Sequence, residues 1–107
     1  MRWRVEILND AISDELDAWP VDVRAALVRI VERMELVGLA RLREPHVKHL
    51  RGKIWEMRPG ASGKEGRALY VTARSSRIVI VAAFIKKGQK TPQRWLDLAE
   101  ERAKSVT

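Results

Sequence analysis

The sequence contains no cysteine, and its N-terminal segment contains no long apolar run. The lack of cysteine excludes a disulfide scaffold, a thiolate metal site and a cysteine nucleophile, and it is compatible with a reducing cytoplasm. In the opening MRWRVEIL, the charges of Arg2, Arg4 and Glu6 interrupt the apolar residues, so the segment has no signal-peptide core. We therefore expect a soluble, cytoplasmic protein with no membrane partner.

Several motifs of known chemistry are also missing. The chain has neither a GxGxxG pattern nor a phosphate-binding loop, and it has no histidine and carboxylate arranged to activate a hydroxyl. His46 and His49 are three residues apart, and Glu44 is the carboxylate near them. We therefore expect no metal site and no cofactor, and neither ATP-driven nor serine-hydrolase chemistry is indicated.

The composition is that of an ordinary globular domain. The 107 residues are 46% hydrophobic and 33% charged, which allows a sizeable core and argues against disorder. We expect one domain over residues 1–107.

The net charge of +7 is unevenly distributed along the chain. Residues 1–40 carry five basic and eight acidic residues, a net charge of −3, whereas residues 41–107 carry 16 basic and six acidic residues, a net charge of +10. A concentrated positive field attracts polyanions, of which nucleic acid is the commonest. The alternative is a basic surface that serves only solubility.

The spacing of apolar residues predicts a compact α+β domain in the order β-α-α-β-β-β-α, with an antiparallel-rich sheet. The first two helices form a hairpin that covers the sheet, a last helix also packs on it, and the continuous apolar run at 77–85 indicates a strand buried on both faces. The expected strands cover residues 3–7, 53–58, 67–74 and 77–85. The first expected helix is capped by Asp10 or Ser13 and runs through Asp17 or Ala18. The second runs from Val21 to near Gly38 and the last from Pro92 through Ala103, and residues 39–52 are interpreted as a loop.

Basic residues and one tyrosine gather on the second half of the predicted sheet. Because strand ends lie together in space, we expect Arg58, Arg67 and Lys86 to converge. Such a group suits a phosphodiester, since arginine binds two phosphate oxygens and lysine supplies a point charge or a general base. The alternative is a charged sheet face exposed to water. The whole set is Lys48, Arg51, Arg58, Arg67, Tyr70, Lys86, Lys87 and Lys90.

The same region resembles the signature of the RelE-like toxins of bacterial type II toxin–antitoxin systems, in particular the HigB branch and its phage-derived relatives. The resemblance covers about residues 46–104, and the opening strand and helical hairpin agree in order. The matching positions are Lys48, Leu50 and Gly52, then Trp55, Glu56, Met57 and Arg58, then Arg67 and Tyr70, and finally Phe84, Lys86, Lys87, Lys90, Thr91 and Pro92.

The resemblance implies a RelE-like fold and a metal-independent endoribonuclease that cuts mRNA on the ribosome through the ribose 2′-hydroxyl. It assigns Arg58 and Arg67 to phosphate stabilisation, and Lys86 or Lys87 to that role or to proton transfer. Relatives carry a tyrosine or histidine near the C-terminus, but this chain ends AEERAKSVT, so His49 becomes a candidate acid or base. Lys48, Arg51, Lys53 and Lys90 are expected to bind the RNA backbone, and Tyr70 either stacks on a base or belongs to the core.

The resemblance also implies a cognate antitoxin, commonly one with a helix-turn-helix domain. The alternatives are a gyrase-inhibiting toxin of the ParE type without nuclease activity, and a non-catalytic RNA-binding module. Replacing Arg67 or Lys86 by alanine is expected to relieve toxicity and to leave the fold intact.

Overall fold

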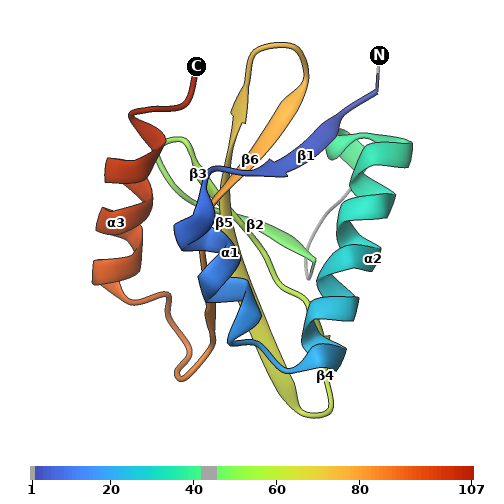
Figure 1. The fold of residues 1–107 in the computed structure, drawn as a ribbon, viewed down its shortest axis with the longest axis vertical. Coiled ribbons are helices and arrows are strands. Elements are labelled where there is room, and N and C mark those ends of the chain that lie inside the picture. The colour runs from blue at the N-terminus through green and yellow to red at the C-terminus, as the bar shows by residue number, and fades with distance from the viewer. Residues whose placement is uncertain (1, 42–45) are drawn as a thin grey trace.

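The computed structural model describes residues 2–41 and 46–107 (Figure 1). The elements are β1 (Arg4–Ile7), α1 (Asp10–Asp17), α2 (Val21–Val37), a 3-10 turn (Leu39–Arg41), β2 (Val47–Arg51), β3 (Ile54–Met57), β4 (Gly60–Ala61), β5 (Lys64–Ala73), β6 (Arg77–Ile85) and α3 (Gln93–Ala103). The predicted α+β class is therefore confirmed.

The sheet has the order β1-β6-β5-β3-β2, and the short β4 pairs with β5. β1 runs parallel to β6, and every other pairing in the described chain is antiparallel. Val79, Ile80 and Val81 in β6 are at most 2% exposed. The prediction that this strand is buried on both faces is confirmed.

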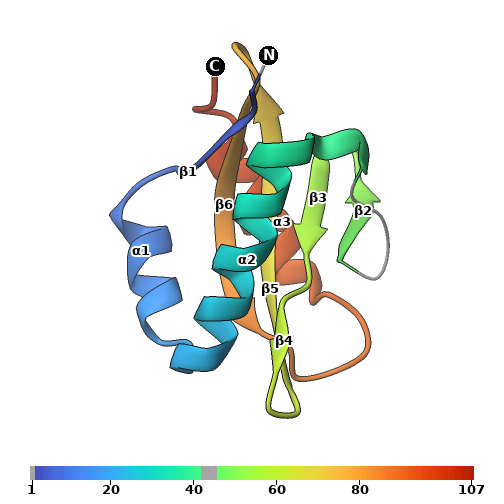
Figure 2. The same ribbon diagram turned by 90° about the vertical axis from the view of Figure 1, so that its right-hand side faces the viewer.

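Helices cover both faces of the sheet (Figures 1 and 2). α1 and α2 pack on one face around Ile12, Val23 and Met34, and α3 packs on the other face through Ala99 and Trp95. The apolar stripe at steps of three and four along α2 explains why that helix buries one side against the sheet. Within the described residues, no helix combines the length and apolar character needed to cross a membrane.

The interpretation of residues 39–52 as a loop is wrong for Val47–Arg51, which forms β2 and pairs with β3. Of the five residues, Val47 alone is buried, so the segment has no apolar alternation from which a strand could be predicted. Its pairing with β3 makes it a strand. Residues 42–45 of the predicted loop lie outside the described residues.

The first helix also begins differently from the prediction. Asn9, rather than Asp10 or Ser13, is the N-cap, because its backbone is extended and its side chain accepts a hydrogen bond from the Ala11 amide at 3.0 Å.

Gly66 fixes β5 against the connection between the first two helices. A Cβ placed on Gly66 would lie 2.5 Å from the Trp19 indole, so the strand can pass here only with glycine. The neighbours of Gly66 in the strand, Glu65 and Arg67, point to the opposite face. This contact sets the position of the candidate site described next.

Candidate functional site

Cross-strand pairing gathers charged residues on the face of the sheet that α3 covers. Glu56 lies opposite both Lys48 and Leu69, and Arg67 lies opposite Phe84. Residues directly opposite each other share a face, and Leu69 and Phe84 belong to the core beneath α3. Lys48, Glu56 and Arg67 therefore lie on that same face.

Glu56 and Arg67 form a buried ion pair at the centre of this face. Glu56 is 0% and Arg67 is 2% exposed, and Arg67 Nη1 lies 3.0 Å from Glu56 Oε1. Arg67 Nε donates to Glu65 Oε2 at 2.7 Å, and the Thr91 hydroxyl donates to Glu56 Oε2 at 2.9 Å. Removing one member of a buried ion pair costs about 3–5 kcal/mol when the remaining charge is left without a partner.

Arg58 lies at the rim of this pair and reaches the surface. Its Nε is 3.2 Å from Glu56 Oε1 and 4.0 Å from Glu65 Oε2, and its side chain is 21% exposed. Glu56 and Glu65 thus hold two guanidinium groups side by side. Of these two groups, Arg58 is the one that solvent and a ligand can reach.

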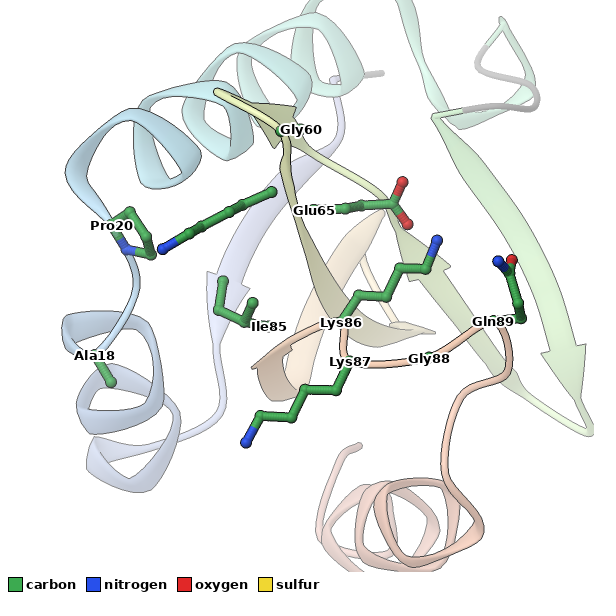
Figure 3. Close-up of a pocket in the computed structure, with 11 residues that line it drawn as sticks. Ala18, Pro20, Gly60, Glu65, Ile85, Lys86, Lys87, Gly88 and Gln89 are labelled. Carbon is green, nitrogen blue, oxygen red and sulfur yellow. The ribbon is translucent and has the colours of Figure 1, made fainter.

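Lys86 approaches Glu65 from the end of β6, where its backbone amide donates to the Glu65 carbonyl at 2.9 Å. Figure 3 shows Lys86 extended toward the side of Glu65 and Gln89, whereas Lys87 extends away from them. A cleft of about 750 Å³, here called the lysine cleft, is lined by Lys64, Glu65, Lys86, Lys87 and neighbouring residues. Arg58, Arg67 and Lys86 therefore meet around Glu65, and their catalytic roles remain predictions.

His49 is not brought to this group. It lies in β2, opposite Trp55, and successive residues of a strand face opposite sides, so it points away from the face of Lys48 and Glu56. Its Nε2 is 2.8 Å from the Gly52 carbonyl oxygen, and its ring centroid is 5.0 Å from that of Trp55.

Arg51 connects the β2–β3 hairpin to α3. Its Nη2 lies 2.7 Å from Asp97 Oδ1 and also binds Glu100. The hydrogen bond from Arg51 holds the pKa of Asp97 below its ordinary value. Because two carboxylates already neutralise Arg51, its expected contact with an RNA backbone would have to break these pairs.

Tyr70 belongs to the core, which is the second of the two alternatives left open for it. It is 0% exposed and packs among the residues beneath α1 and α2. Its hydroxyl makes no hydrogen bond in the described structure, and burial raises the pKa of Tyr70 above its ordinary value. A role in stacking on a base is contradicted by this burial.

The expectation that Arg67 can be replaced without harm to the fold is also wrong. Its guanidinium neutralises Glu56 and Glu65 inside the protein. Alanine at this position would leave the fully buried Glu56 without its closest cation. Lys86, which is only half-buried, remains a suitable position for substitution.

The remaining predicted residues are exposed lysines. They make no ion pair within the described part of the chain, so their charges are free to meet a ligand. They are Lys48 on β2, Lys53 in the β2–β3 turn, Lys87 after β6 and Lys90 before α3.

The sequence patterns had assigned no role to Glu56 and Glu65, the two carboxylates that hold the arginines of the site. A signal was present for the two carboxylates, because Glu-x-Arg occurs twice, as Glu56 and Arg58 at the end of β3 and as Glu65 and Arg67 within β5. The sequence patterns also missed Arg29 and Arg33 of α2, which line a second cleft together with Arg58. In residues 2–41 and 46–107, no group of three or more acidic or histidine side chains is placed to hold a metal ion.

Comparison with known protein families identifies a family that covers most of the chain. The family model described as "Phage derived protein Gp49-like (DUF891)" matches residues 14–104, from within α1 to the end of α3. None of the curated proteins matches the chain.

Proposed function

This chain belongs to the phage-derived Gp49-like (DUF891) family, a HigB-like family of RelE/ParE toxins, and from that premise we propose its activity. The proposed activity is that of a type II toxin that cuts mRNA on the ribosome without a metal ion and thereby inhibits translation. A cognate antitoxin, carrying a helix-turn-helix domain, neutralises it. The observation that carries this proposal is the placement of Arg58 and Lys86 around Glu65, where Arg58 also contacts Glu56 of the buried ion pair.

The proposed reaction is a transesterification within the RNA. The ribose 2′-oxygen forms a bond to the adjacent phosphorus while the bond from phosphorus to the 5′-oxygen breaks. The 2′-hydroxyl loses its proton to a base, and an acid protonates the leaving oxygen. The products are a 2′,3′-cyclic phosphate and a free 5′-hydroxyl, and the step needs positive charge on the non-bridging oxygens.

The side chains around Glu65 match these needs. Glu65, whose side chain is 33% exposed, takes the role of the base for the 2′-hydroxyl, and Arg58 binds the non-bridging oxygens. Lys86, whose side chain extends toward the same side as Glu65 in Figure 3, donates the proton to the 5′-oxygen. Arg67 is a positioning residue, because it is buried and acts through the two carboxylates.

A cleavage assay on ribosomes tests this proposal. Programmed ribosomes are incubated with the protein in the presence of a chelator, and new 5′ ends of the mRNA are mapped and checked for a 5′-hydroxyl. Arg58→Gln and Lys86→Gln are each expected to lower the cleavage rate about 10²- to 10³-fold, the cost of losing one charge-stabilising group. Arg74→Gln, in the exposed β5–β6 turn, changes the net charge equally and is expected to cleave normally.

The alternative functions give different results. The protein is first induced in a bacterium that lacks the partner gene. Broken chromosomal DNA with intact mRNA would then contradict the proposal and favour a gyrase inhibitor. Tight RNA binding with no new 5′ ends would contradict it in favour of a non-catalytic RNA-binding module. Normal cleavage by both Arg58→Gln and Lys86→Gln would overturn the assignment of the site.

A further inference from the structure

A second cleft, here called the α2 cleft, lies between α2 and the segment that follows β3. Its volume is about 500 Å³. Arg29 and Arg33 of α2 line one side, and Arg58 lines the other. Ala26, Ile30 and Pro59 give it an apolar part between these cations.

The arginines on the α2 side are not neutralised. Arg29 and Arg33 are both exposed, and neither forms an ion pair within the described residues. They are four residues apart on one helix, a spacing at which like charges repel. The helix therefore carries an unfavourable pair of charges, which an anion bound in the cleft would relieve.

The α2 cleft continues into the lysine cleft, because Gly60 and Glu65 line both. Together the two clefts make a cationic track that passes the end of the β4–β5 hairpin. Glu65 is the one carboxylate among the described residues that line it. The cations, in order from α2 to the end of β6, are Arg33, Arg29, Arg58, Lys64, Lys86 and Lys87.

We propose that the α2 cleft is a binding site for the single-stranded RNA next to the scissile phosphodiester, with Arg29 and Arg33 on its phosphates. This inference rests on the proposed function, since it takes Arg58 and Glu65 as the point of cleavage. A linear polyanion with a charge on every unit matches a track whose cations are continuous across both clefts. The apolar part formed by Ala26, Ile30 and Pro59 accommodates a base.

The salt dependence of RNA binding tests this inference. The probe is a short single-stranded oligoribonucleotide with 2′-O-methyl riboses, which cannot be cut, and its affinity is measured by fluorescence anisotropy from low to high KCl. Each phosphate contact on a single strand contributes about 0.7 to the slope of log K against log salt. Arg29→Gln with Arg33→Gln is therefore expected to lower the slope by about 1.4. The ratio of the RNA affinity of the unchanged protein to that of the double variant therefore falls about 7-fold between roughly 50 and 200 mM salt.

A matched control separates site binding from net charge. Arg2→Gln with Arg74→Gln removes the same charge from two exposed positions, one next to the N-terminus and one in the β5–β6 turn. The N-terminus and this turn lie at the end of the sheet opposite the β4–β5 hairpin (Figure 1). This control is expected to keep the slope of the unchanged protein. Equal slopes for the two double variants would overturn the inference.

Ribosomal cleavage measured on the same variants distinguishes the inference from the proposed function. Cleavage by the unchanged protein, with no loss of slope in the Arg29/Arg33 variant, overturns the inference and leaves the function standing. A lower slope in the Arg29/Arg33 variant, together with no cleavage by the unchanged protein, supports the RNA site and overturns the proposed nuclease activity. The inference is also overturned if the protein does not bind RNA but binds an acidic peptide through Arg29 and Arg33. That result would favour a protein partner.

Discussion

The hydroxyl of Tyr70 is buried in the core without a hydrogen bond in the described structure. A buried donor without a partner costs about 1–3 kcal/mol. Tyr70→Phe removes that oxygen and keeps the ring, so it is expected to equal or exceed the unchanged protein in stability, measured by urea unfolding. RNA cleavage is expected to be unchanged. Loss of cleavage in a stably folded Tyr70→Phe would contradict the assignment of this residue to the core.

The same side chain gives an alkaline pH dependence whose sign follows from its burial. Burial raises the pKa of Tyr70 in the folded state above the unfolded value of 10.0. The neutral phenol's contribution to stability is therefore complete below about pH 10 and is lost as the pH rises further. Tyr70→Phe lacks this loss, so the stability difference between the two proteins is expected to widen above pH 10. A constant difference would contradict the burial.

The convergence of Arg58, Arg67 and Lys86 could be predicted from the sequence, because antiparallel strands place their ends side by side. The sequence alone could not predict that Arg67 is buried whereas Arg58 is partly exposed, although both follow a glutamate by two residues. Thr91, in the segment just before α3, donates to Glu56 and accepts a hydrogen bond from Arg67 at 3.4 Å, so it contacts both members of the buried pair. These contacts depend on where the last helix packs, which no local pattern encodes.

At the scale of elements, two side chains complete the edge of β6. β1 pairs only with Arg77–Ile80, so the backbone beyond it lacks a neighbouring strand there. Arg102 of α3 donates to the Val81 carbonyl at 2.9 Å, and Glu15 of α1 accepts from the Ala83 amide at 3.0 Å. The two side chains also pair with each other at 2.8 Å. They satisfy an open edge and join two helices to it.

Glu15→Ala and Arg102→Ala are each expected to lower the free energy of unfolding by about 1–3 kcal/mol, because each leaves a backbone atom and a half-buried charge without a partner. The double variant is expected to lose less than the sum, since both remove the same pair. Lys104→Ala is the control, because its pair with Glu101 is exposed and is expected to contribute nothing measurable. Additive losses in urea unfolding would contradict the coupling.

The elements that could be predicted from the sequence are those with a strong apolar pattern. The run at 77–85 defines a strand that is buried on both faces, and the stripe along α2 defines one buried side of a helix; both were located correctly. β2 has no such pattern, because it lies at the sheet edge and its hydrogen bonds to β3 make it a strand. No local pattern indicates the cleft beside Arg29 and Arg33, because its other side is formed by Arg58 and Pro59, far away in the sequence.

For the whole molecule, the division of charge along the chain is not a division in space. The first 40 residues carry a net charge of −3, yet two of their five basic residues line the same cationic track as the lysines after β6. Folding brings α2 alongside the hairpin that follows β3, so the acidic first part supplies cations to the track in addition to supporting the sheet.

The arrangement of the sheet predicts how stability is distributed over the whole molecule. β6 lies between β1 and β5 and has a core on each face, whereas β2 is an edge strand paired only with β3. Exposing the amides of Val79 and Ile80 therefore requires global unfolding, whereas β2 can open locally. Native-state hydrogen exchange is expected to give β6 an opening free energy equal to that from urea unfolding, and β2 a smaller one. Equal protection of the two strands would mean that β2 unfolds only with the core, which the single pairing of β2 with β3 does not support.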